Sequence, residues 1–186
     1  MRRAVFLDRD GTINVDKNHL YKAEDWEWIP GAEDAIKCFN ELGFLVIVAT
    51  NQSGIARGLY SSEDVNFLHS YVNMLLLRSK AKIDAYYYCP HHPDFGEVRD
   101  CPCRKPKPGM LLKAQQDYNI DLENSFMIGD KSSDILAGQA AGATPLLVAA
   151  GYGKDELSAL KAEKIITAAD LYGAYRIIKA RLKGEG

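Results

Sequence analysis

The sequence lacks any apolar run of the roughly 18 residues that a membrane span needs, because its hydrophobic stretches are short and charge interrupts them. It also lacks excess charge of either sign: 23 Lys and Arg residues stand against 25 Asp and Glu residues, and the net charge is -2. This balance gives no support to a nucleic-acid or membrane partner. Repeats and Gly/Ser linkers are absent too, so we expect a single domain over residues 1–186.

Cysteine is scarce, with four residues in the chain. The first residues lack the full apolar segment and the small-residue cleavage site of a signal peptide, so we expect a cytoplasmic location. Cysteines in that reducing compartment are more often thiols or metal ligands than disulfides.

Short apolar runs alternate with helix-like segments along the chain. This order is typical of an α/β fold with an open, mostly parallel sheet and helices on both faces. Ligands of such sheets bind at the carboxyl ends of the strands. The pattern predicts strands at 3–8, 44–49, 85–88, 125–128 and 145–149, and helices at 32–42, 61–80, 110–118, 135–141 and 169–182.

Two carboxylates, Asp8 and Asp10, directly follow the first predicted strand. In an extended chain they lie on one side, with Arg9 opposite. Such close carboxylates repel, so either one is protonated or a cation lies between them, and Mg²⁺ suits oxygen ligands. In the chemical interpretation Asp8 attacks phosphorus, while Asp10 protonates the leaving oxygen and later activates water. The alternative is a strand that ends in a solvated turn, and this motif alone leaves both open.

Three other polar segments lie at predicted strand or helix ends. Thr50 to Ser53 offer hydroxyls and amides to a phosphate. Asp130 can add an oxygen to Mg²⁺, with Asp134 supporting it one helical turn later. Lys105 can neutralise a phosphoryl group and Arg104 can bind a second anion. Each segment alone also fits a polar turn, a helix cap or a solvated basic loop.

A loop over residues 89–103 concentrates metal-ligating residue types. Three thiols and one imidazole make a closed tetrahedral site of the structural zinc type. The thiols are those of Cys89, Cys101 and Cys103, and the imidazole is that of His91 or His92. The alternative is a set of unligated thiols beside surface histidines.

Together these segments resemble the haloacid dehalogenase superfamily of phosphohydrolases. D-x-D-G-T at 8–12 is its first motif, Thr50 its second, Lys105 its third and G-D-x-x-x-D at 129–134 its fourth. The strings ATNQSGIARG, CPHHP and CPCRKPKPGM resemble its histidinol-phosphatase-like branch. The resemblance implies a Rossmann-like sheet without a large cap domain and with a zinc-bound loop insertion.

The resemblance also implies a phosphatase that forms a phosphoaspartate. Its catalytic residues would be Asp8, Asp10, Thr50 and Lys105. Mg²⁺ would be held by Asp8, by Asp130 and by the backbone carbonyl of Asp10. Structural Zn²⁺ would be held by Cys89, His91, Cys101 and Cys103, with His91 favoured over His92.

For the substrate, the resemblance implies a sugar bisphosphate: a heptose 1,7-bisphosphate that loses its 7-phosphate in nucleotide-heptose precursor synthesis. Histidinol phosphate is the alternative, and Arg104 favours the bisphosphate because a second phosphate needs a cation. A zinc-stabilised binding module without chemistry is the third reading. We expect a monomer. The substrate contacts that the resemblance implies are Asp16, Lys17, Asn18, His19, Thr50, Asn51, Gln52, Ser53, Arg104, Lys105 and Lys131.

Overall fold

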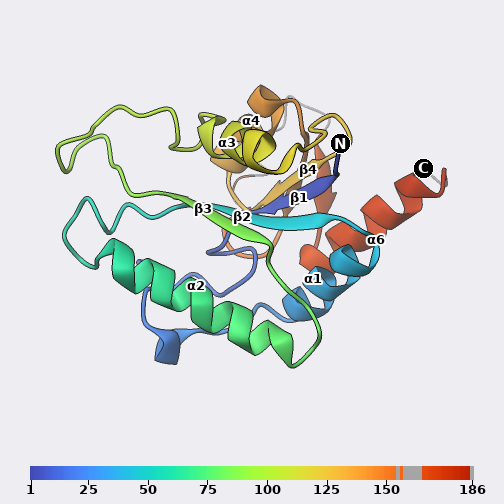
Figure 1. The fold of residues 1–186 in the computed structure, drawn as a ribbon, viewed down its shortest axis with the longest axis horizontal. Helices are drawn as coiled ribbons and strands as arrows, with labels where there is room; N and C mark the ends of the chain where they lie inside the picture. The colour runs from blue at the N-terminus through green and yellow to red at the C-terminus, as the bar shows by residue number, and fades with distance from the viewer. Residues whose placement is uncertain (154–155, 157–164, 185–186) are drawn as a thin grey trace.

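One open parallel sheet is the centre of the computed structural model, which describes residues 1–153, 156 and 165–184 (Figure 1). Among those residues the sheet has six strands in the order β3-β2-β1-β4-β5-β6, and every neighbouring pair is parallel. The strands are β1 (Ala4–Leu7), β2 (Leu45–Asn51), β3 (Ala85–Cys89), β4 (Phe126–Gly129), β5 (Thr144–Val148) and β6 (Ile166–Ala168).

Helices cover both faces of this sheet, which confirms the predicted fold class (Figure 1). One face carries α1 (Ala32–Glu41), α2 (Ser62–Leu77) and α6 (Leu171–Leu182), and the other carries α3 (Gly109–Tyr118) and α4 (Ser132–Ala141). No helix among the described residues is both long and apolar enough to cross a bilayer.

The central strands are apolar on both sides because each side packs against helices. In β1, alternate side chains enter two different cores: Val5 and Leu7 pack on the side of α1, α2 and α6, whereas Phe6 packs with Leu111 of α3. All four residues of β1 are buried. The continuous apolar runs that predict β1, β2 and β4 therefore reflect burial on two faces.

The predicted elements are all present, but several bounds differ, and α4 begins at Ser132 rather than at 135. The helix predicted at 61–80 begins with the expected capping box between Ser61 and Asp64 but ends at Leu77. The edge strand β6 was not predicted, because it has three residues, of which two are partly buried and Thr167 is exposed, and so forms no apolar run. A 3-10 turn at Ala23–Asp25 is a further short element.

The strand order places the candidate site. From β1 the chain runs outward through β2 and β3, and it then returns to pair β4 with the other side of β1. The carboxyl ends of β1, β2 and β4 therefore meet where the order reverses, which is the usual ligand position in open α/β sheets. Asp8, Thr50 and Asp130 lie at these three strand ends.

Candidate active site

Three buried carboxylates form the centre of the site. Asp8 follows β1, Asp130 follows β4 and Asp134 lies in the first turn of α4. One carboxylate oxygen of each lies within 4.8 Å of the others. Asp134 also caps the start of α4, because its Oδ2 accepts the backbone N–H of Lys131 at 3.0 Å. This contact confirms the interpretation of Asp134 as a helix-entry acid, whereas its support of a magnesium ligand stays a prediction.

Lys105 supplies a cation to this cluster. Its buried ammonium lies 2.8 Å from an oxygen of Asp8 and 2.6 Å from an oxygen of Asp134. Burial would lower the pKa of Lys105, but Asp134 and Asp8 raise it above the ordinary lysine value, so the side chain stays charged. Asn51 fixes the lysine backbone: it accepts the Lys105 N–H and donates to the Lys105 carbonyl, both at 3.1 Å.

The cluster fits a divalent cation with oxygen ligands. Asp130 accepts the Tyr152 N–H at 2.9 Å through Oδ2, while its buried Oδ1 has no hydrogen-bond partner in the described part of the chain. Burial and the nearby Asp8 carboxylate raise the pKa of Asp130 to about 7. A Cβ on Gly11, whose φ is +86, would lie 2.2 Å from Asp130 Oδ2, so only glycine leaves room for this carboxylate. Three carboxylates against one ammonium leave a buried charge that a hard dication can balance.

The carboxylate of Asp10 forms its hydrogen bonds with residues outside this cluster. It accepts hydrogen bonds from Arg9 Nη2 at 2.9 Å, from Asn14 Nδ2 at 3.0 Å and from Gln52 Nε2 at 3.0 Å. Burial would raise the pKa of Asp10, but the Arg9 guanidinium and the two amides hold it below the ordinary aspartate value. Asp10 is therefore an ionised acceptor in this state.

The prediction that Arg9 lies opposite the two carboxylates is wrong. Its buried side chain turns back to Asp10 and also donates to the Leu20 carbonyl at 2.7 Å. The prediction assumed an extended chain, but regular pairing ends before Asp8, and Asp10 forms an isolated bridge with Asn14. Side-chain alternation no longer applies there.

A cavity of about 310 Å³ lies over Lys105 and gathers most of the predicted substrate contacts. Thr50 is not among the lining residues; it is 1% exposed and accepts a hydrogen bond from the lining residue Gln52. Lys17 is outside the lining, and its ammonium pairs with Glu27 at 3.0 Å. The lining consists of Asp10, Asp16, Asn18, His19, Asn51, Gln52, Ser53, Tyr60, Arg104, Lys105, Lys131 and Ser133. Tyr60 and Ser133 were not predicted; Ser133 adjoins Asp134 in its motif, whereas no sequence signal marks Tyr60.

Two further cations, Arg104 and Lys131, line the cavity. The Nη1 of Arg104 donates to the carbonyl of His91 at 3.0 Å. The Lys131 ammonium lies 3.4 Å from an Asp16 oxygen. Burial opposes the charge of Lys131, but Asp8 and Asp130 raise its pKa above the ordinary value. The cavity is therefore suited to an anionic ligand.

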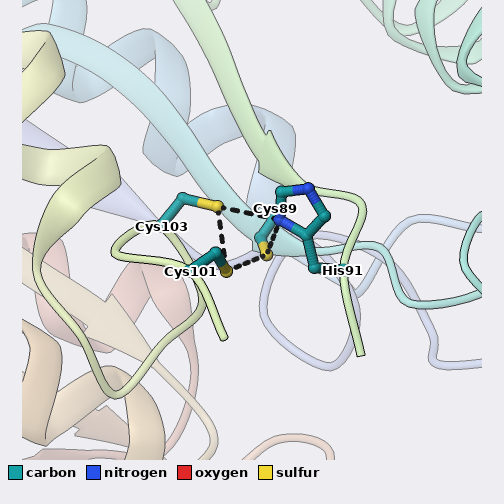
Figure 2. Close-up of side chains that lie close together, drawn as sticks. All are labelled: Cys89, His91, Cys101 and Cys103. Atoms are coloured by element: carbon teal, nitrogen blue, oxygen red, sulfur yellow. Dashed lines mark hydrogen bonds between the residues drawn. The ribbon is translucent and has the colours of Figure 1, made fainter. Parts of the chain in front are cut away.

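The predicted cysteine and histidine cluster is assembled, and Figure 2 shows its four side chains pointing toward one another. The sulfur of Cys101 lies 3.5 Å from that of Cys89 and 3.3 Å from that of Cys103. His91 Nδ1 lies 3.7 Å from Cys89 Sγ and 3.4 Å from Cys103 Sγ. A disulfide would need about 2 Å, whereas ligands 2.3 Å from a tetrahedral zinc are roughly 3.8 Å apart. His92 instead contacts Arg57 at 2.9 Å.

The chain is similar to several known proteins. A family model described as HAD-hydrolase-like matches residues 102–174. The D-glycero-beta-D-manno-heptose-1,7-bisphosphate 7-phosphatase of Yersinia pestis is 42% identical over 186 residues, which cover 97% of each chain. That of Pasteurella multocida is 45% identical over 143 residues, 76% of this chain and 78% of that protein. The crystal structure of D,D-heptose 1,7-bisphosphate phosphatase from B. bronchiseptica, complexed with magnesium and phosphate, has a TM-score of 0.87 and 33% identity and covers 99% of each chain.

Replacing Lys105 should destabilise the fold strongly. In metal-free buffer at neutral pH, we expect Lys105→Met to lower the free energy of unfolding by about 3–5 kcal/mol, because the aspartates lose a buried counter-charge. Lys107→Met is the matched control, since Lys107 pairs with Asp100 at the surface and should matter little. Urea denaturation of both variants measures the difference, and equal small losses would contradict the electrostatic account.

Proposed function

The chain belongs to the haloacid-dehalogenase-like hydrolases, in the family of the D-glycero-beta-D-manno-heptose-1,7-bisphosphate 7-phosphatases, and we propose that it removes the 7-phosphate of this heptose bisphosphate. It is a phosphatase, and its family implies a phosphoaspartate mechanism. The observation that carries the proposal is that Lys105 both contacts the buried Asp8 and lines a cavity with further cations. The product would serve the synthesis of ADP- or GDP-activated heptose.

In the proposed reaction, Asp8 is the nucleophile. Its carboxylate attacks the phosphorus in line, the bond to the sugar oxygen breaks, and an acyl phosphate forms on Asp8. Asp10 is ionised in this state, so it must first take up a proton from solvent or from a protonated oxygen of the bound phosphate. It gives that proton to the departing oxygen and then takes one from the water that attacks the same phosphorus. Hydrolysis returns Asp8 to a carboxylate and releases inorganic phosphate.

Two further residues would stabilise the transferring group. Lys105 neutralises charge on the phosphoryl oxygens, and its ion pair with Asp8 keeps the ammonium beside the reacting carboxylate. The Thr50 hydroxyl accepts a hydrogen bond from Gln52 at 3.0 Å, which leaves its own O–H free to donate to a phosphoryl oxygen.

Magnesium is the cation we propose for the carboxylate cluster. Asp8, Asp130 and the backbone carbonyl of Asp10 would hold it. When bound, it supplies positive charge against the phosphoryl oxygens and the nucleophile. The unpartnered Asp130 oxygen and the raised pKa of that carboxyl support this assignment.

The second phosphate of the substrate would be recognised at the cation-lined part of the cavity. Arg104 can bind it through a fork of two N–H groups, and Lys131 adds a second positive charge. Asp16, Asn18 and His19 would contact the sugar hydroxyls. Histidinol phosphate lacks the second phosphate, so Arg104 favours the heptose bisphosphate over that alternative.

The proposal extends to a monomer of one domain in the cytoplasm, acting on a small molecule rather than on nucleic acid. None of the four cysteines forms a disulfide, which is in keeping with a reducing compartment. Arg104 directly follows the candidate ligand Cys103, and its guanidinium is bonded to the backbone of His91. Zinc bound by the four clustered side chains would therefore fix the position of Arg104.

Elemental analysis tests the zinc assignment. We expect one zinc per chain, lost in Cys101→Ser, together with a lower melting temperature, because the loop at 89–103 has little core of its own. Cys38→Ser is the control, since Cys38 lies on α1 and outside the cluster. Stoichiometric iron, or zinc that persists in Cys101→Ser, would contradict the assignment.

Comparative turnover tests the substrate. With Mg²⁺ present, we expect kcat/KM for the heptose 1,7-bisphosphate to exceed that for histidinol phosphate by at least about a hundredfold, because only the bisphosphate engages Arg104. Asp8→Asn should lose all turnover of either substrate. A preference for histidinol phosphate would overturn the substrate assignment, and full activity of Asp8→Asn would overturn the nucleophile.

A further inference from the structure

Tyr60 contacts the catalytic machinery although it lies outside every motif of the sequence. Its side chain lines the cavity and is 8% exposed. The phenolic O–H donates to Gln52 Oε1 at 2.7 Å. Gln52 Nε2 in turn donates to Asp10 Oδ2 and to Thr50 Oγ1, both at 3.0 Å. One chain of hydrogen bonds therefore joins Tyr60 to two proposed catalytic groups.

These contacts leave Gln52 a single favourable amide orientation. The ionised Asp10 carboxylate can only accept, so the NH₂ group of Gln52 must face it. A rotated amide would place Oε1 against the carboxylate and leave two acceptors in contact. The Tyr60 hydroxyl satisfies Oε1 on the far side and thereby stabilises the productive orientation.

We propose that Tyr60 is a positioning residue that acts through Gln52 to orient Asp10 and Thr50 for phosphoryl transfer. This inference rests on the proposed catalytic roles of Asp10 and Thr50. It also changes the role of Gln52 from substrate contact to internal support. Gln52 is 2% exposed, and both polar atoms of its side chain are already bonded within the protein.

The surroundings of Tyr60 fix its ring in place. A Cβ on Gly54 would lie 2.2 Å from Tyr60 Cε1, so the absence of a side chain at 54 makes room for the ring. Tyr21 stacks on Tyr60, with ring centroids 5.2 Å apart. Burial raises the pKa of the phenol, which remains a hydrogen-bond donor at neutral pH.

Tyr60→Phe keeps the ring and removes the hydrogen bond. We expect kcat for the sugar bisphosphate to fall about three- to tenfold, because this is the decrease that the loss of one hydrogen bond between neutral groups causes. KM should change less than twofold, because Arg104 and Lys131 are untouched. Tyr21→Phe removes a hydroxyl from the stacked neighbour and should retain wild-type kcat and melting temperature. A wild-type kcat for Tyr60→Phe would overturn the proposal.

A double-mutant cycle tests whether Tyr60 acts through Gln52. In a Gln52→Leu background, Tyr60→Phe should cause no further loss of kcat, because the linking amide is gone. Losses that multiply would overturn the proposal and indicate an independent role for Tyr60.

Vanadate binding in the presence of Mg²⁺ separates this proposal from the substrate assignment. Vanadate resembles the five-coordinate phosphorus of the transition state and has no sugar, so Tyr60→Phe should weaken its binding about three- to tenfold. If that loss occurs but the heptose bisphosphate is not hydrolysed, the positioning role stands and the substrate assignment fails. Equal vanadate affinity in wild type and Tyr60→Phe would overturn the positioning role.

Discussion

The burial of three carboxylates at one point is the constraint on which the rest of this structure depends. Asp8, Asp130 and Asp134 are each at most 5% exposed, and their oxygens lie within 4.8 Å of one another. Burial and mutual repulsion both disfavour the ionised forms, so the cluster needs counter-charge. Lys105 supplies one positive charge, while burial and the nearby Asp8 carboxylate still raise the pKa of Asp130.

Several features of the chain serve to place this cluster and its counter-charge. The reversal of strand order brings the ends of β1 and β4 together, and Gly11 leaves space for the Asp130 carboxylate. The Asn51 side chain at the end of β2 links to the backbone of Lys105, although the two residues are 54 positions apart. The cysteine and histidine loop then continues directly into Arg104 and Lys105. Stability of this loop and geometry of the anion-binding cavity are consequently coupled.

The sequence predicted the parts of the fold that depend on local pattern. Apolar runs identify β1, β2 and β4 because these strands are buried on both faces, whereas the three-residue edge strand β6 has no such run. The site residues at strand ends could be placed because parallel strands share one carboxyl edge. The choice of His91 over His92 followed from the family pattern, and the structure agrees with it.

Contacts that depend on tertiary structure could not be predicted in this way. The turn after Asp8 brings Arg9 back to Asp10, where an extended chain would have separated them. Lys17 adjoins predicted contacts in the sequence, yet it pairs with Glu27 outside the cavity. Tyr60 reaches Gln52 only because the loop folds back over Gly54. No periodicity or spacing in the sequence indicates which residue each of these side chains contacts.

We conclude that the negative charge of the buried carboxylates is not fully balanced until a divalent cation binds. The most direct measurement is the free energy of unfolding of wild type and Asp130→Asn, with and without Mg²⁺. The account predicts that the asparagine variant is the more stable of the two without Mg²⁺, since it removes one buried like charge while keeping an acceptor for Tyr152. Millimolar Mg²⁺ should stabilise wild type alone. A wild type insensitive to Mg²⁺, or a metal-free variant less stable than wild type, would contradict the account.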